Sequence, residues 1–90
     1  MMYVTAYLNV ISNRNIEDIM KEFKKLEEKT NQEEGCIYFH AHLIDKEKKK
    51  IVLWEIWKDE DSLNKHHKMP HTVFCASQKL TEVEWLLKSR

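Results

Sequence analysis

Two neighbouring stretches of the chain, CIYFHAHLI (36–44) and IVLWEIW (51–57), are rich in β-branched and aromatic residues. They predict two strands, and the short charged link between them predicts an antiparallel hairpin. Successive side chains of a strand point to opposite faces, and here apolar residues occupy both odd and even positions. Any fold that contains this hairpin must therefore cover both of its faces.

The remaining residues predict one strand and one helix before the hairpin, and two short helical stretches and one strand after it. The predicted order is a strand at 2–11, a helix from Asn15 to about Thr30, the hairpin, a short helix whose first turn holds the acidic residues 59–62, a helical stretch opened by Pro70, and a strand at 82–87. We expect one α+β domain over residues 1–90, with a four-stranded antiparallel sheet and the helices on one face.

Helices on one side of such a sheet leave its other face uncovered. In this chain that face would be an apolar patch of about several hundred Å², which monomeric proteins rarely expose. A second copy of the same sheet is the simplest cover. The sequence therefore predicts a homodimer.

Composition excludes several classes of function. Fifteen basic and fifteen acidic residues cancel, so no net charge favours nucleic acid or an anionic membrane. No apolar run approaches the roughly 20 residues of a membrane span, and the N-terminus has no signal-peptide pattern. Cys36 and Cys75 lack the spacing of a zinc site or a disulfide framework, so we expect reduced thiols in a cytoplasmic protein. Gly35 is the only glycine, which excludes a Gly-rich nucleotide loop and favours chemistry without a cofactor.

The stretch NKHHKMPH (64–71) holds three of the five histidines. His66 follows Leu63 by three residues, so its imidazole is expected to face inward. His71 follows Pro70 in the first turn of a helix, where free N–H groups and the helix dipole disfavour a protonated ring. Both are candidate catalytic bases, because a neutral imidazole can accept a substrate proton. The alternative is that each satisfies a backbone carbonyl or a carboxylate at a helix end.

The stretch EEGCIYFHAHLIDKEKKKIVLWEIWKDEDSLNKHHKMPH resembles the antibiotic biosynthesis monooxygenase (ABM) domain. It contains an E-x-G motif at 33–35, an E-x-W motif at 55–57, and an H-x4-H motif from His66 to His71 with Pro70 before the second histidine. The resemblance implies a ferredoxin-like βαββαβ sandwich whose sheet pairs with that of a second copy to form a dimeric α+β barrel.

The resemblance also implies a set of activities, since ABM proteins include cofactor-independent oxygenases of anthrones and quinols. In such a reaction His66 or His71 would deprotonate a small aromatic or quinol-like substrate, and the resulting anion would pass an electron to O₂. The residues expected to line the substrate pocket are Tyr7, Phe39, Trp57 and Phe74, with Asn9 as a hydrogen-bond partner.

Of three other functions, two stay open. Haem-degrading members of the family use an Asn on the first strand, a Trp on the second helix and a later His as iron ligand. Asn9 could match the first, but the helix position is His66 and no histidine follows His71, so the resemblance does not extend to haem. An isomerase of a phosphorylated signal shares H-x3-PH followed by Cys75, with His71 as base and Lys65 or Lys68 near the phosphate. The third possibility is a dimeric module that binds a small apolar ligand without turnover.

A metal site is the alternative use of the histidines. His40 and His42 share one strand face, in an H-x-H arrangement found in some metal sites, and would need a third ligand from Glu55 or His71. Nothing in the sequence brings such a ligand near, so we expect no metal. Glu55 itself lies in a central strand, where an unpaired carboxylate is costly, and we expect it to pair with Lys, Arg or His.

Overall fold

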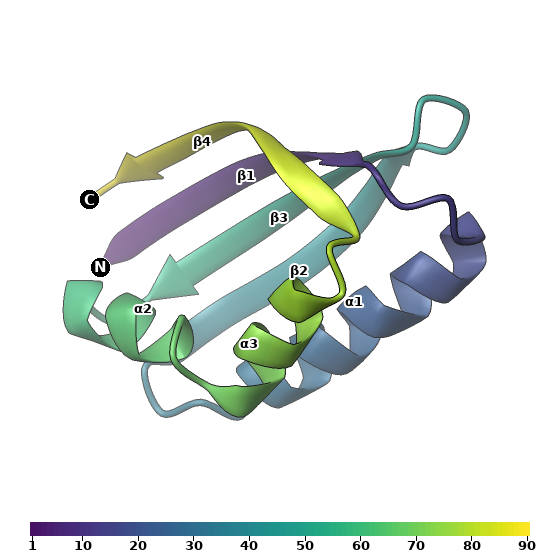
Figure 1. Cartoon of the computed structure of the whole chain (residues 1–90). Coiled ribbons are helices and arrows are strands. Elements are labelled where there is room, and N and C mark those ends of the chain that lie inside the picture. The colour runs from purple at the N-terminus through teal and green to yellow at the C-terminus, as the bar shows by residue number, and fades with distance from the viewer.

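The computed structural model describes all 90 residues. Its elements are β1 (Met2–Val10), α1 (Ile16–Thr30), β2 (Cys36–Asp45), β3 (Lys50–Trp57), α2 (Glu60–His66), α3 (Pro70–Ser77) and β4 (Thr81–Ser89). The strands form one sheet in the order β2-β3-β1-β4, and all neighbours are antiparallel. The three helices lie on one face of this sheet (Figure 1). The predicted ferredoxin-like α+β fold is confirmed. None of the helices is both long enough and apolar enough to cross a membrane.

The core lies between this sheet and α1. The helix begins where the sequence predicts, since the Asn15 side chain accepts a hydrogen bond of 2.8 Å from the Glu17 backbone N–H. Its apolar residues recur at helical spacing and face the sheet. The buried cluster comprises Met2, Val4, Ala6, Leu8, Ile16, Ile19, Phe23, Leu26, Phe39, Ala41, Ile51, Trp57, Leu63 and Leu80.

The C-terminal half of α1 also covers the free edge of β2. The Asn31 side chain donates to the Phe39 carbonyl (2.9 Å) and accepts from the Phe39 N–H (3.1 Å), as a neighbouring strand would. Glu27 accepts from the Ala41 N–H at 2.9 Å. These side chains satisfy the outward backbone groups of Phe39 and the N–H of Ala41, so this part of the β2 edge is not available to pair with another strand.

Gly35 allows the loop between α1 and β2 to lie against the start of α2. A Cβ atom at this position would come within 2.0 Å of the Ser62 Oγ, which is far inside van der Waals contact. The Gly35 carbonyl also accepts a hydrogen bond of 2.9 Å from the Lys58 N–H. The only glycine of the chain is thus required by a close approach between two segments.

The sheet face opposite the helices is bare and apolar. Its exposed side chains include Tyr3, Tyr38, Trp54, Trp85 and Leu87. This is the surplus apolar face expected from the hairpin sequence. Its cover by a second copy stays a prediction.

Candidate active site

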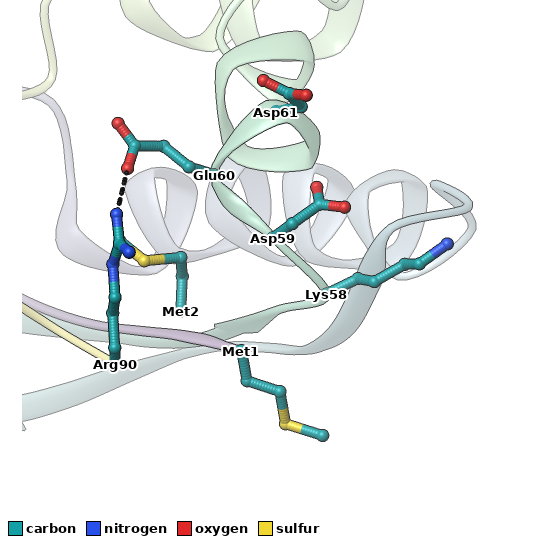
Figure 2. A pocket seen from close by; sticks show the side chains of 7 residues that line it. All are labelled: Met1, Met2, Lys58, Asp59, Glu60, Asp61 and Arg90. Carbon is teal, nitrogen blue, oxygen red and sulfur yellow. Dashed lines mark hydrogen bonds and ion pairs between the residues drawn. The ribbon is translucent and has the colours of Figure 1, made fainter.

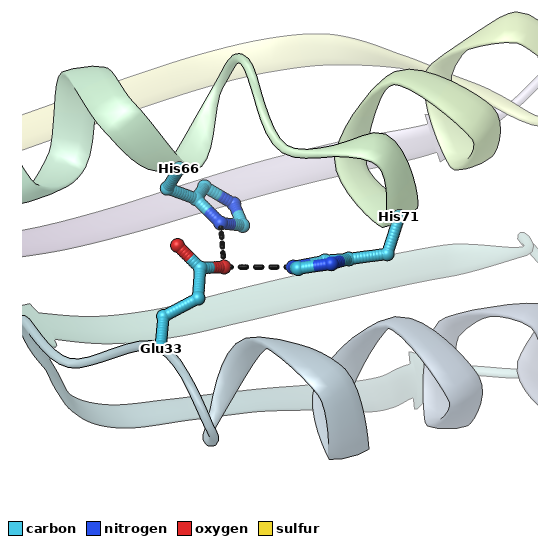
Figure 3. A group of neighbouring side chains, drawn as sticks. All are labelled: Glu33, His66 and His71. Carbon is cyan, nitrogen blue, oxygen red and sulfur yellow. Dashed lines mark hydrogen bonds and ion pairs between the residues drawn. The ribbon is translucent and has the colours of Figure 1, made fainter.

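Glu33 connects the two histidines of the H-x4-H motif. Its Oε2 atom lies 2.7 Å from His66 Nδ1 and 2.7 Å from His71 Nε2 (Figure 3). The side chains of Glu33, His66 and His71 are only 6%, 5% and 15% exposed, so water does not compete for these bonds. We call these three residues the Glu33 group.

Three different segments position the Glu33 group. Glu33 lies in the tight loop before β2, where its backbone N–H donates to the Thr30 carbonyl (3.0 Å). His66 is the last residue of α2, and His71 is the second residue of α3. Pro70 occupies the first turn of α3 and sets the sharp junction between the two helices. The E-x-G and H-x4-H motifs, far apart in sequence, therefore form one site.

The shared oxygen fixes the proton positions on both rings. A carboxylate oxygen only accepts hydrogen bonds, so His66 donates through Nδ1–H and His71 through Nε2–H. This leaves His66 Nε2 as an unprotonated acceptor with no hydrogen-bond partner in the protein. Burial lowers the pKa of His66, and the hydrogen bond to Glu33 opposes that shift. His66 is thus a neutral base at neutral pH.

His66 stands in the wall of a cavity of about 300 Å³ between the sheet and the helices. The lining is mostly apolar and contains no lysine or arginine: Leu8, Phe23, Leu26, Phe39, Leu53, Glu55, His66, His67, Thr72, Cys75, Ala76, Leu80, Thr81 and Val83. The imidazole of His66 also packs on Trp57 (ring centroids 4.7 Å apart) and on Phe39 (5.6 Å). The cavity therefore places the His66 base in a mostly apolar, partly open space.

Glu55 is the second ionisable group that is buried beside this cavity. Its partner is the Trp57 indole, whose Nε1–H donates to Glu55 Oε1 at 2.9 Å. The expectation that a Lys, Arg or His would pair with Glu55 is wrong. Burial raises the pKa of Glu55 to about 7, so the carboxyl can be neutral and needs no cation. A neutral indole donor is then sufficient.

The other residues expected in the pocket lie elsewhere. Tyr7 and Asn9 are on the bare face, where Tyr7 packs on Trp85 (5.0 Å) and Asn9 accepts a hydrogen bond from Lys50. Phe74 is 62% exposed and lines a groove between α1 and α3. His71 borders the same groove and not the cavity. Of the expected residues, Phe39 and His66 line the cavity, whereas Trp57 is fully buried against His66 and does not line it.

The alternative metal site, with His40, His42 and a third ligand from Glu55 or His71, is not formed, because these side chains lie on opposite faces of the sheet. His40 and His42 lie on the bare face, and His40 Nδ1 pairs with Glu27 Oε1 at 2.6 Å. Glu55 and His71 are on the helix side of the sheet.

The Glu33 group is the one set of ligating side chains whose donor atoms all lie within 4.8 Å of one another. Its two 2.7 Å contacts are hydrogen bonds that already hold protons between the ligating atoms. A cation would have to displace both protons.

A separate depression of about 310 Å³ lies beside the start of α2 (Figure 2). Three of its charged groups already have partners. Glu60 pairs with Arg90 at 3.2 Å, and Asp59 accepts from the Ser62 N–H at 2.8 Å as the N-cap of α2. The Asp59 and Asp61 carboxylates do not converge on a common point. This depression has the features of a helix start, not of a reactive centre.

Sequence reasoning identified His66 and His71 but gave Glu33 no role of its own. The available signal was the E-x-G motif, which pointed to the family and not to a partner for the histidines. The lining residues Thr72 and Cys75 were also missed as cavity residues, since short helices carry little periodicity. Contacts between segments so distant along the chain cannot be read from local pattern.

The fold and the site define a small α+β protein with a carboxylate-supported histidine beside an apolar cavity. Residues 1–73 match the family model of antibiotic biosynthesis monooxygenases, a span that includes the whole Glu33 group. The chain belongs to the antibiotic biosynthesis monooxygenase family.

The chain is also similar to individual known proteins. The uncharacterized protein YjcS of Bacillus subtilis (strain 168) is 54% identical over 89 residues, which cover 99% of this chain and 85% of YjcS. A solved YjcS structure superposes with a TM-score of 0.97 at 53% identity, covering 99% of this chain and 96% of that one. A crystal structure of an antibiotic biosynthesis monooxygenase superposes with a TM-score of 0.82 at 20% identity, covering 100% of this chain and 97% of that one. This similarity supports the fold.

Proposed function

We propose that this protein is a cofactor-independent monooxygenase that oxidises a small aromatic or quinol-like substrate with O₂. The observation that carries the proposal is the state of His66. Its imidazole is buried, held by Glu33 through Nδ1, and free at Nε2, beside an apolar cavity. Membership of the antibiotic biosynthesis monooxygenase family supports the same reaction class.

The size and lining of the cavity suit a compact aromatic substrate. An apolar cavity of about 150 Å³ can hold a benzene ring. This cavity, at about 300 Å³, has room for two or more fused rings. Phe39 and the aliphatic side chains around it provide apolar contacts for the faces of such a ring system.

In the proposed reaction, His66 Nε2 removes a proton from a substrate O–H or an acidic C–H group. The electron-rich anion transfers one electron to O₂, and the resulting radical pair combines to form a C–O bond. The imidazolium returns its proton to the peroxide oxygen. When the carbon carries a further hydrogen, loss of water from the CH–OOH group leaves a carbonyl, so CH₂ and O₂ become C=O and H₂O. Glu33 stabilises the imidazolium formed in the first step.

His71 has a supporting role in this proposal. It donates to the same Glu33 oxygen as His66 and does not border the cavity. It therefore fixes the carboxylate that orients His66, and we assign it as a positioning residue. The proposal gives no role in this cavity to Tyr7, Asn9 or Phe74.

The two alternatives differ in what they require of the cavity. The isomerase alternative uses His71 as its base with Lys65 or Lys68 near the phosphate, but Lys65 lines a different depression from His71, and His71 Nε2 is engaged by Glu33. The groove that His71 borders contains Lys25 and Lys29, whereas the cavity beside His66 has no lysine or arginine. A module that binds an apolar ligand without turnover would use the same apolar lining. Binding therefore fits both the oxygenase and the module, and only turnover separates them.

The deciding experiment measures O₂ uptake with a panel of anthrones and hydroquinones. We expect uptake by the natural protein with at least one member of the panel, and its loss in His66→Ala. His42→Ala is the matched control, because His42 lies on the opposite face of the sheet. Binding without uptake across the panel would assign the protein to the ligand-binding class.

A further inference from the structure

Glu55 is positioned to face whatever ligand enters the cavity. It comes from β3, on the sheet side of the cavity, whereas His66 comes from α2 on the helix side. One Glu55 oxygen is held by the Trp57 indole at 2.9 Å. The other oxygen has no hydrogen-bond partner in the protein, and it is accessible to solvent. That free oxygen is therefore available to a ligand.

The surroundings of Glu55 keep its carboxyl group neutral up to a higher pH than is usual for a glutamate. Burial raises its pKa, the nearby Glu33 carboxylate adds to this shift, and the Trp57 indole and Lys88 on β4 oppose it. Lys88 forms no ion pair with Glu55. The other titratable side chains near it are Cys36 on β2, and His66 and His67 around the cavity. A protonated carboxyl differs from a carboxylate in that it can donate a hydrogen bond.

We infer that Glu55 is the second half of the site, a neutral carboxyl group that donates a hydrogen bond to a ligand oxygen while His66 takes the proton. The ligand class that fits both groups is a fused-ring ketone or phenol. Its oxygen becomes negative when the substrate loses a proton, and its rings fill the apolar cavity. This catalytic role rests on the proposed function, whereas the ligand contact does not.

The proton transfer involves only these two residues and the ligand. As His66 Nε2 removes a proton from the acidic carbon of the ketone, the C–H electron pair passes through the conjugated system to the carbonyl oxygen. The Glu55 O–H group donates its hydrogen bond to that oxygen, where the negative charge develops. No oxidant takes part until the enolate meets O₂.

Two substitutions separate this role from a purely structural one. In Glu55→Gln, the amide oxygen can keep the bond to the Trp57 indole, and the NH₂ group replaces the free carboxyl oxygen as a permanent donor. In Glu55→Leu, no donor remains. Loss of one hydrogen bond should weaken ligand binding by about three- to tenfold.

The test uses 1-tetralone, a ketone of two fused rings, with its carbonyl carbon labelled. Binding is measured by titration, and the carbonyl stretch of the bound ligand by difference infrared spectroscopy, from pH 5 to pH 9. With the natural protein we expect a stretch at lower frequency than in an apolar solvent, and weaker binding as pH rises through about 7. Glu55→Gln should keep the shifted stretch at every pH, and Glu55→Leu should lose it.

The proposal is overturned if Glu55→Leu binds as the natural protein does with an unchanged stretch, or if Glu55→Gln keeps the pH dependence. It is also overturned if the folded natural protein does not bind the ketone. If Leu disrupts folding, the pH profile of Glu55→Gln alone decides. A Glu55-dependent stretch without O₂ uptake on the anthrone panel would refute the oxygenase and leave the ligand contact standing.

Discussion

Each face of the sheet carries two histidines beside one glutamate, but the two groups differ in structure. On the helix side, Glu33 accepts from both His66 and His71, and all three side chains are largely buried. On the bare side, Glu27 reaches around the edge of β2 and pairs with one histidine, His40, at 2.6 Å. His42 packs edge-on against Trp54, with centroids 4.6 Å apart, and its Nε2 atom has no partner.

The difference shows that the residue types alone do not make a site. Burial lowers the pKa of both His66 and His42. Of these two histidines, only His66 has a hydrogen-bonded carboxylate that orients the ring and can stabilise its charged form. Only His66 also borders a cavity in which a substrate could be held. Orientation, charge stabilisation and space must coincide before a neutral imidazole can act as a base.

The largest expected effect is on turnover in His66→Ala. Loss of a general base typically lowers the rate by about 10²–10⁴-fold. Turnover of the best substrate from the oxygen-uptake panel measures this effect, and a denaturant melt of the same variant shows that the fold persists. His42→Ala should leave turnover unchanged. Equal losses in the two variants would remove the distinction between the two groups.

The pH dependence of the unfolding free energy tests whether the pKa of Glu55, which is buried on the helix side of the sheet, is raised by folding. In the folded protein the pKa of Glu55 is about 7, which is above its value in the unfolded chain. The contribution of Glu55 to the free energy of unfolding is therefore complete below about pH 4.5 and is lost as pH rises through about 7. The loss is up to about 3 kcal/mol. His66, whose folded-state pKa is lowered, acts in the opposite direction and costs stability as pH falls below about 6.5.

Urea melts between pH 4.5 and pH 8 measure this effect. Glu55→Gln should gain stability relative to the natural protein as pH rises from 5 to 8. Parallel pH profiles for the two proteins would show that the pKa of Glu55 is the same in the folded and unfolded states.

The bare face should be an interface between two copies. Trp54, on the inner strand β3 of this face, is 47% exposed and packs on His42. A second copy would bury both side chains. Truncation or charging of a buried interface tryptophan commonly costs about 2 kcal/mol or more of association. Light scattering after size exclusion should give twice the chain mass for the natural protein and a shift toward the monomer for Trp54→Glu. A monodisperse monomer of the natural protein at micromolar concentration would contradict the barrel.

The smallest expected effect compares the two glutamates. In Glu33→Gln, two hydrogen bonds to a charged acceptor become bonds to a neutral one, which should cost about 1–2 kcal/mol of unfolding free energy. Glu27→Gln weakens its bonds to His40 and the Ala41 N–H at a more exposed place, and we expect a smaller loss of about 0.5–1 kcal/mol. Denaturant melts at pH 7 rank the two. In turnover, only Glu33→Gln should show a reduced rate.

Local sequence patterns were sufficient to predict the helices, the strands and a single antiparallel sheet. Alternation in residues 2–11, helical spacing after Asn15, and Pro70 as a helix start are local signals, because side-chain direction repeats with a fixed period along each element. The two apolar faces of the hairpin likewise indicated that one sheet face would stay bare. His66 was expected to face inward from its spacing to Leu63, and it does.

Which residues share a site depends on contacts between segments that are distant along the chain. Glu33 is 33 residues before His66, and no periodicity links a loop before β2 to the junction of two short helices. Tyr7 and Asn9 have the residue types of a pocket, but the strand pleat turns them to the bare face, opposite His66. Glu55 acquired an indole partner and a raised pKa because folding buried it beside Trp57. Period and propensity act within one segment, whereas burial and long-range contacts arise only when separate segments pack together.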